Sequence, residues 1–181
     1  MDGGLSGDFM PLFARLLGRD FDLLPAVVRR LHLRPGVARH HGEVEVRRGR
    51  GWLSRLCATA TRLPPAGQGP ITVDIDIQPD TERWTRHVRG HAMPSRLWWQ
   101  DGLLCERLGW VKFGFRLHVH EAGIEWRVER VHALGLPLSA RWFAGVRARE
   151  SAQGGRYAFD VQASLPGIGL LVHYRGWLHV D

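Results

Sequence analysis

Two histidines and a glutamate stand close together in the segment RLHVHEAGIEWRVERV (116–131), and these residue types bind metal ions. His118 and His120 alternate with apolar residues as on a β-strand, so their side chains share one face, while that of Glu121 lies on the other. A two-residue turn at 122–123 would also place arginines on the face of the histidines, where they repel a divalent cation. We therefore predict a hairpin with a solvated polar face here, and no metal site.

An arginine on an apolar strand face is the second feature that could do chemistry. In the segment RWTRHVRG (83–90), Arg86 alternates in step with the apolar positions. A turn at 80–81 would place it opposite Ile75 of the preceding alternating run, on the side that faces the core. A planar guanidinium in such a place suits a carboxylate or phosphate group, because its fork binds both oxygens at once.

A glutamate occupies a similar position in a second hairpin, which turns at 154–155. Counting from that turn, Glu150 falls opposite Phe159 on the inner face. A buried charge costs several kcal/mol unless it is paired. Arg86 and Glu150 could therefore lie at a rim, pair with each other as a structural link, or anchor the polar head of a ligand. In the last case the body of the ligand would contact aromatic residues of the inner faces: Trp84, Phe115, Trp126 and Tyr174.

Catalytic signatures are missing from the sequence, which contains no GxGxxG, GxxxxGK[ST], GxSxG or HExxH motif. Asp74 and Asp76 form a pair of carboxylates, but they alternate with apolar residues and are predicted on an exposed strand face. An acid/base pair of Glu150 with His132 is the remaining catalytic hypothesis, because His132 continues an apolar face unless a bulge near Arg130 turns it outwards. We expect no cofactor and no metal, and a protein that is not an enzyme.

Composition narrows the possible partners. The chain has 181 residues and a formal net charge of +7, which invites nucleic acid as a partner. The basic residues are almost all arginine and are scattered along the chain, as in a GC-rich genome, so nucleic-acid binding is not expected. Neither a membrane span nor a secretory signal is visible, and two cysteines without metal spacing, Cys57 and Cys105, favour a reduced, cytoplasmic protein.

The elements that must position these residues fall into two groups. Helical spacing covers 9–18, 25–32 and 51–65, with a short strand at 43–46. From Pro70 onwards the period changes to two, and tight-turn signals separate about eight or nine strands in all. We predict one domain, 1–181, with a helical N-terminal part (about 8–63) and a mainly β part (about 70–181). Such an antiparallel meander closes into a lipocalin-like barrel, or curls as a strongly curved sheet around a helix in the helix-grip manner.

A family resemblance extends over nearly the whole chain. The segments LPAVVRRLH, ERWTRHVRG, FGFRLHV and RYAFDVQASLPGIGLLVHYRGWL, in this order, resemble the bacterial family catalogued as domain of unknown function 4166, and the last segment is the most specific. Members of that family occur alone or attached to NAD(P)-dependent reductases similar to saccharopine dehydrogenase. The resemblance therefore implies, by association, a role in small-molecule or lipid metabolism, and it brings no catalytic residues.

Together these patterns predict a non-catalytic barrel that holds a small apolar or amphipathic molecule, with Arg86 as its polar anchor. The alternative is an interaction module that docks an NAD(P)-dependent reductase or another partner through a basic outer face. An enclosed pocket with Arg86 pointing inwards favours the first hypothesis, and a filled interior favours the second.

Overall fold

The computed structural model describes residues 9–52, 56, 63–120 and 123–180. The helical elements are α1 (Leu12–Leu17), the 3-10 helices η1 (Gly18–Leu23) and η2 (Ala140–Phe143), and α2 (Ala26–Leu33). The strands are β1 (Gly36–Arg48), β2 (Gly67–Ile77), β3 (Thr81–Val88), β4 (His91–Gln100), β5 (Leu103–Leu108), β6 (Val111–His120), β7 (Gly123–Ala133), β8 (Leu136–Leu138), β9 (Arg147–Gln153), β10 (Arg156–Leu165) and β11 (Gly169–Leu178).

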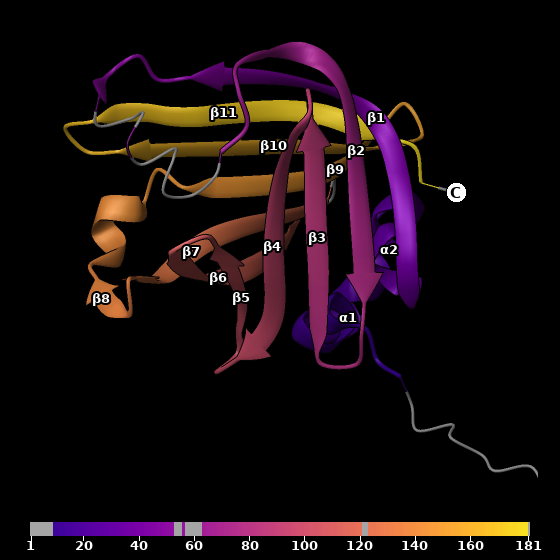
Figure 1. Cartoon of the computed structure of the whole chain (residues 1–181). Coiled ribbons are helices and arrows are strands. Elements are labelled where there is room, and N and C mark those ends of the chain that lie inside the picture. The colour runs from indigo at the N-terminus through magenta and orange to yellow at the C-terminus, as the bar shows by residue number, and fades with distance from the viewer. Residues whose placement is uncertain (1–8, 53–55, 57–62, 121–122, 181) are drawn as a thin grey trace, which may run out of the picture.

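The strands form one antiparallel sheet that closes on itself (Figure 1). Its order is β6-β5-β4-β3-β2-β1-β11-β10-β9-β7-β8, and β6 also pairs with β7. This last pairing closes a barrel of ten strands, while β8 lies outside the ring and pairs with β7. The predicted mainly β fold is confirmed as a barrel, with slightly more strands than expected.

The strands are long because polar and apolar residues alternate over their whole length. In β1 the buried positions include Ala38, His40, Val44 and Val46, which all lie on the same face. The short strand predicted at 43–46 is therefore the second half of a strand of 13 residues. Its first half carries two histidines and a glycine, which hide the alternation from a hydrophobicity pattern.

The N-terminal helices close one end of the barrel. Leu12 and Phe13 of α1 and Leu31 and His32 of α2 are buried against the strands. Figure 1 shows α1 and α2 together at one side of the molecule and β8 at the other. The helices predicted at 9–18 and 25–32 are confirmed, whereas most of the third, 51–65, lies outside the described residues.

Two hairpins have a different register from the one predicted. The chain turns at Pro79-Asp80, so Arg86 pairs with Val73 and Trp84 with Ile75. In the other hairpin His120 pairs with Gly123, so the expected turn at 122–123 is wrong by one residue. Each error shifts the pairing by two residues, and because side chains alternate with a period of two, the residues between the turn and the bulge at Glu129 keep their predicted faces.

The polar face of the β6–β7 hairpin is solvated and carries ion pairs. The guanidinium of Arg116 donates hydrogen bonds to both carboxylate oxygens of Glu129, and His120 Nε2 lies 3.1 Å from an oxygen of Glu125. The described residues contain no cluster of three or more side chains that could hold a metal ion. No helix in the described part of the chain is long and apolar enough to cross a membrane.

Candidate functional site

A cavity of about 430 Å³ lies inside the barrel. Its wall is almost entirely apolar and comes from most strands of the ring, namely β2, β3, β5, β6, β7, β9, β10 and β11. The helices α1 and α2, which close one end of the barrel, are called the helical plug below. At this inner end the cavity wall includes Trp84 and Trp126, which pack on Phe13 of the plug. At the other end it includes Ile168 and Trp142, and Trp142 is 66% exposed. The cavity therefore has a floor at the helical end and reaches the surface at the opposite, open end of the barrel.

All of the predicted ligand-binding residues line this cavity: Trp84, Arg86, Phe115, Trp126, Glu150 and Tyr174. The structure brings them together from β3, β6, β7, β9 and β11. Trp126 packs against Phe115 with ring centroids 5.5 Å apart and against Trp84 at 6.4 Å. Trp142 is the only other tryptophan in the wall of the cavity.

Arg86 lines the cavity and is largely buried, with 12% of its side chain exposed. Its guanidinium donates a hydrogen bond to Ser95 Oγ at 3.0 Å and lies 3.4 Å from a carboxylate oxygen of Glu106. It also sits over the ring of Trp84, with its central carbon 5.2 Å from the ring centroid. The charge is thus compensated by a buried carboxylate, but at a distance too long for a strong ion pair.

Two tyrosines accompany this guanidinium. Burial alone would lower the pKa of Arg86, but nearby Tyr174, Glu106 and Tyr157 outweigh it and raise that pKa. Burial raises the pKa of both tyrosine hydroxyls, and for Tyr157 the carboxylate of Glu150 adds to this rise. Both hydroxyls therefore stay protonated, and they can donate or accept a hydrogen bond inside the barrel.

Glu150 has a partner on the helical plug. His32 Nε2 of α2 lies 2.7 Å from Glu150 Oε2, and both side chains are buried. The imidazole stacks on Phe13 of α1, with ring centroids 3.6 Å apart. Among the described contacts Arg86 and Glu150 do not pair with each other, so the predicted structural link between them is replaced by separate partners. Each charge is satisfied in the way that burial requires.

A second carboxylate lies under the same histidine. Glu82 is fully buried, and its Oε2 accepts a hydrogen bond of 2.8 Å from the indole nitrogen of Trp84. Burial raises the pKa of Glu82, and the neighbouring Glu150 adds to this rise, while His32 and the indole N–H oppose it. Two buried carboxylates therefore lie at the floor of the cavity, Glu150 in contact with His32 and Glu82 in contact with Trp84.

Sequence reasoning missed four polar residues of this inner end: His32, Glu82, Glu106 and Tyr157. Three of them were detectable from alternation alone. Glu82 is in step with Arg86, Glu106 stands between the inward Leu104 and Leu108, and Tyr157 is in step with Phe159. His32 had no such signal, since a histidine at the end of a helix is usually solvated, and its partner is 118 residues away.

The proposed acid/base pair is not assembled. Glu150 pairs with Ile124, and His132 lies eight residues farther along β7, about 26 Å away at the usual rise per residue. A bulge at Glu129 also turns His132 outwards and brings Val131 inwards, as the sequence allowed. The two side chains cannot act on one substrate.

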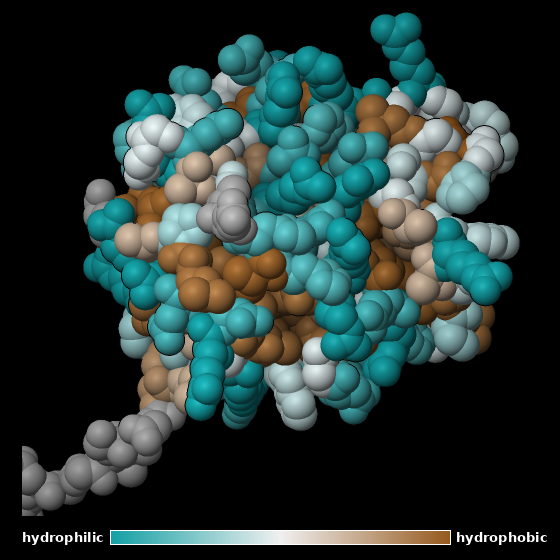
Figure 2. Space-filling model, turned by 180° about the vertical axis from the view of Figure 1, so that it is seen from behind, coloured by the Kyte–Doolittle hydropathy of each residue, from teal (hydrophilic) through white to brown (hydrophobic). Residues whose placement is uncertain are grey.

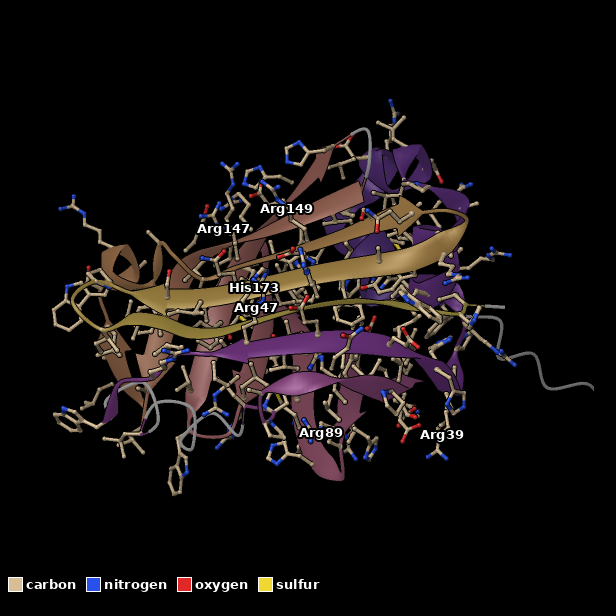
Figure 3. All side chains as sticks on the ribbon, turned by 90° about the horizontal axis from the view of Figure 1, so that it is seen from above. Arg39, Arg47, Arg89, Arg147, Arg149 and His173 are labelled. Carbon is tan, nitrogen blue, oxygen red and sulfur yellow. The ribbon has the colours of Figure 1, made fainter. Side chains whose placement is uncertain are left out.

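The outer face of the barrel carries a broad groove with charges of both signs. Figure 3 shows Arg147 and Arg149 of β9 near His173 of β11 and Arg47 of β1. The groove is lined by the arginines 127, 147, 149 and 175 and by the outward carboxylates of residues 43, 45, 125 and 160. Several of them pair across strands, such as Arg175 with Glu45 at 3.0 Å. These charges cancel, so the groove is not a basic surface.

The fold and the site define a class of closed antiparallel barrels with an internal apolar cavity and a charged inner end. A family model described as Domain of unknown function (DUF4166) matches residues 24–178. The match covers most of the chain, which therefore belongs to that family, as the resemblance implied. No curated protein matches the chain.

Proposed function

We propose that this barrel is a non-catalytic binding domain for a small apolar or amphipathic molecule. The observation that carries the proposal is the cavity of about 430 Å³, whose size is typical of sites for small organic ligands. Burial of apolar ligand surface against its wall would contribute about 25 cal/mol per Å². The open end, at Trp142, offers a path for entry.

Arg86 is the proposed anchor for the polar group of the ligand. Its contacts with Glu106 are long, at 3.4 Å, and leave the guanidinium able to bind a further acceptor. Tyr157 and Tyr174 line the same cavity as Arg86 and could supply further hydrogen bonds to a polar ligand. A carboxylate, phosphate or sulfonate head would fit this corner, and the apolar body would lie along Phe115 and Trp126.

The alternative function, docking of a reductase or other partner through a basic outer face, gains no support from the balanced charges of the outer groove. An NAD(P)-dependent reductase as partner stays a prediction. Catalysis by Glu150 with His132 is not supported by their separation along the sheet.

Native mass spectrometry of the purified chain tests the proposal directly. We expect a bound small molecule that organic solvent releases, and we expect the emptied protein to bind the amphipathic anion 1-anilinonaphthalene-8-sulfonate. The double substitution Arg86→Met with Glu106→Gln should weaken that binding by roughly 10- to 100-fold, because it removes a charge-assisted hydrogen bond. Neutralising both partners avoids leaving one buried charge without compensation.

Arg83→Met is the matched control, because Arg83 lies on the same strand but on the exposed outer face. A second variant, Ala163→Trp, places a large ring in the cavity wall and should abolish binding. Binding that survives Ala163→Trp would reject the cavity as the site. Binding that survives the double substitution, but not Ala163→Trp, would reject Arg86 as the anchor.

A further inference from the structure

Large apolar side chains gather on the open end of the barrel. The connections β5–β6 and β7–β8 meet there, since the backbone N–H of Leu134 donates to the carbonyl of Trp110 at 3.1 Å. The described exposed apolar residues of this end, with exposed fractions from 38% to 73%, are Trp52, Leu56, Trp110, Leu134, Leu136, Leu138 and Trp142. Figure 2 shows hydrophobic residues at the surface towards its right edge, the side on which β8 lies in this view.

The described connections at the open end carry charge of one sign. They comprise residues 49–52, 56, 63–66, 89–90, 109–110, 134–146 and 166–168, and none of these described residues is an aspartate or glutamate. Their basic residues include Arg50, Arg89 and Arg141, all exposed. Within the described chain, the apolar surface at this end is therefore bordered by positive charge.

The opposite end has a different character. The acidic residues Asp20, Asp22, Asp80 and Asp101 stand in the helical segment and in the turns beside it. The guanidinium of Arg15 lies 3.5 Å from Asp80, and that of Arg29 lies 4.0 Å from Asp22. Carboxylates thus accompany the basic groups at the helical end, which makes the molecule asymmetric along the barrel axis.

We propose that the open end docks on the surface of an anionic lipid bilayer. Tryptophan is favoured at the boundary between headgroups and acyl chains, leucine side chains insert below it, and arginine is attracted to anionic headgroups. A second copy of this chain is a poor partner, because two such faces would bring arginines together without any carboxylate to oppose them. The bilayer satisfies the apolar and the positive groups at once.

The cavity opens at the proposed contact. Leu138 and Trp142 belong both to the exposed apolar end and to the cavity wall. A chain docked in this way would present its cavity to the membrane, so an apolar molecule could pass between bilayer and barrel without crossing water. The docking goes beyond the proposed ligand binding and does not depend on it, because the surface residues would contact lipid whether the cavity is filled or empty.

Flotation of the full chain with lipid vesicles tests the docking. We expect the chain to float with vesicles of phosphatidylcholine mixed with phosphatidylglycerol, and to stay behind with phosphatidylcholine alone. The variants Trp110→Ser with Trp142→Ser, and Arg50→Glu with Arg141→Glu, should each lower the bound fraction about tenfold or more. Ala163→Trp, which fills the cavity, should float like the unaltered chain, so failure of docking and failure of ligand binding are distinguishable.

Matched controls carry the same chemical changes at the helical end. Trp99→Ser removes an exposed tryptophan there, and Arg30→Glu with Arg34→Glu reverses two exposed charges. Each should float like the unaltered chain. Absence of flotation with the vesicles that contain phosphatidylglycerol, or equal losses in controls and open-end variants, would reject the proposal. A dimer in sedimentation equilibrium that Trp110→Ser with Trp142→Ser dissociates would assign this face to a second copy instead.

Discussion

The buried charges of the barrel each have a partner from a different element. Arg86 of β3 contacts Glu106 of β5, and Glu150 of β9 contacts His32 of α2. Unpaired, each of these groups would cost several kcal/mol on burial. These pairs therefore hold the helical plug and three strands in one arrangement around the cavity floor. Glu82 is less well paired, because one of its carboxylate oxygens has no hydrogen-bond partner in the described chain.

Glu82→Gln should stabilise the protein as the pH rises. The pKa of Glu82 is higher in the folded than in the unfolded state, so the folded state prefers the protonated form. Stability that is fully present below the ordinary carboxyl pKa, about 4.3, is then lost as the pH rises through the folded pKa. Glutamine keeps an acceptor for the Trp84 N–H and does not ionise. Urea unfolding at several pH values should show a gain for Glu82→Gln that grows with pH and is absent in acid.

Glu125→Gln should have the opposite pH dependence and provides the comparison. Hydrogen bonds from Arg127 lower the pKa of Glu125 to about 2, with His120 and Arg149 also contributing. The stability it contributes is present above the ordinary carboxyl pKa and is lost as the pH falls towards 2. We expect Glu125→Gln to lower the free energy of unfolding by about 2 kcal/mol at neutral pH and by little in acid. This is less than the pKa shift alone would give, because the partners of Glu125 are exposed and solvent screens them. In either variant, a change in the free energy of unfolding that does not depend on pH would contradict the assigned cause.

At the scale of elements, β1 and β11 approach closely where two glycines face the neighbouring backbone. A methyl group at Gly42 would overlap the carbonyl oxygen of Trp177, and one at Gly176 would overlap that of Glu43. The absence of side chains at these positions lets β1 pair along its length with both β2 and β11. The closure of the barrel on this side therefore depends on glycine for space and not for backbone conformation.

Gly42→Ala should destabilise the barrel by more than about 2 kcal/mol, since the backbone of β11 must move to admit the methyl group. Gly69→Ala is the matched control, because Gly69 lies on β2 beside β1 and a methyl there meets nothing within 4 Å. Urea unfolding of the two variants measures the difference. Equal stability of both would show that the β1–β11 seam accommodates side chains without cost.

The sequence predicts which face of a strand each side chain occupies more reliably than it predicts how the strands pair. Alternation placed Trp84, Arg86 and Glu150 on the inner side, and they stay there although one turn lies a residue away from its predicted position. A pairing error of two residues leaves each face unchanged, which explains why the cavity lining was predictable. The contact of His32 with Glu150 was not, because it depends on how a helix seats on the end of a closed barrel, and no local pattern encodes that placement.

At the scale of the whole molecule, the barrel is a container with unlike ends. Phe13 and His32 of the plug stack on each other and contact the tryptophans of the floor, whereas the cavity reaches the surface at the opposite end, beside the exposed Trp142. Water or ligand that enters the described part of the barrel must therefore pass the open end unless the plug moves. Movement of the plug would open a second exit, so a loosened plug should shorten the time that a ligand stays.

Phe13→Ala should loosen the plug and speed up the release of ligand. Phe13 is fully buried, and replacing such a phenylalanine by alanine costs about 3–5 kcal/mol, which a domain of ordinary stability survives. We expect a dissociation rate for 1-anilinonaphthalene-8-sulfonate about tenfold faster, measured by stopped-flow dilution, with a smaller change in the association rate. Phe9→Ala, at a partly exposed position in front of α1, is the control and should leave both rates unchanged. If Phe13→Ala lowers stability but not the residence time, ligand leaves only through the open end and the plug is purely structural.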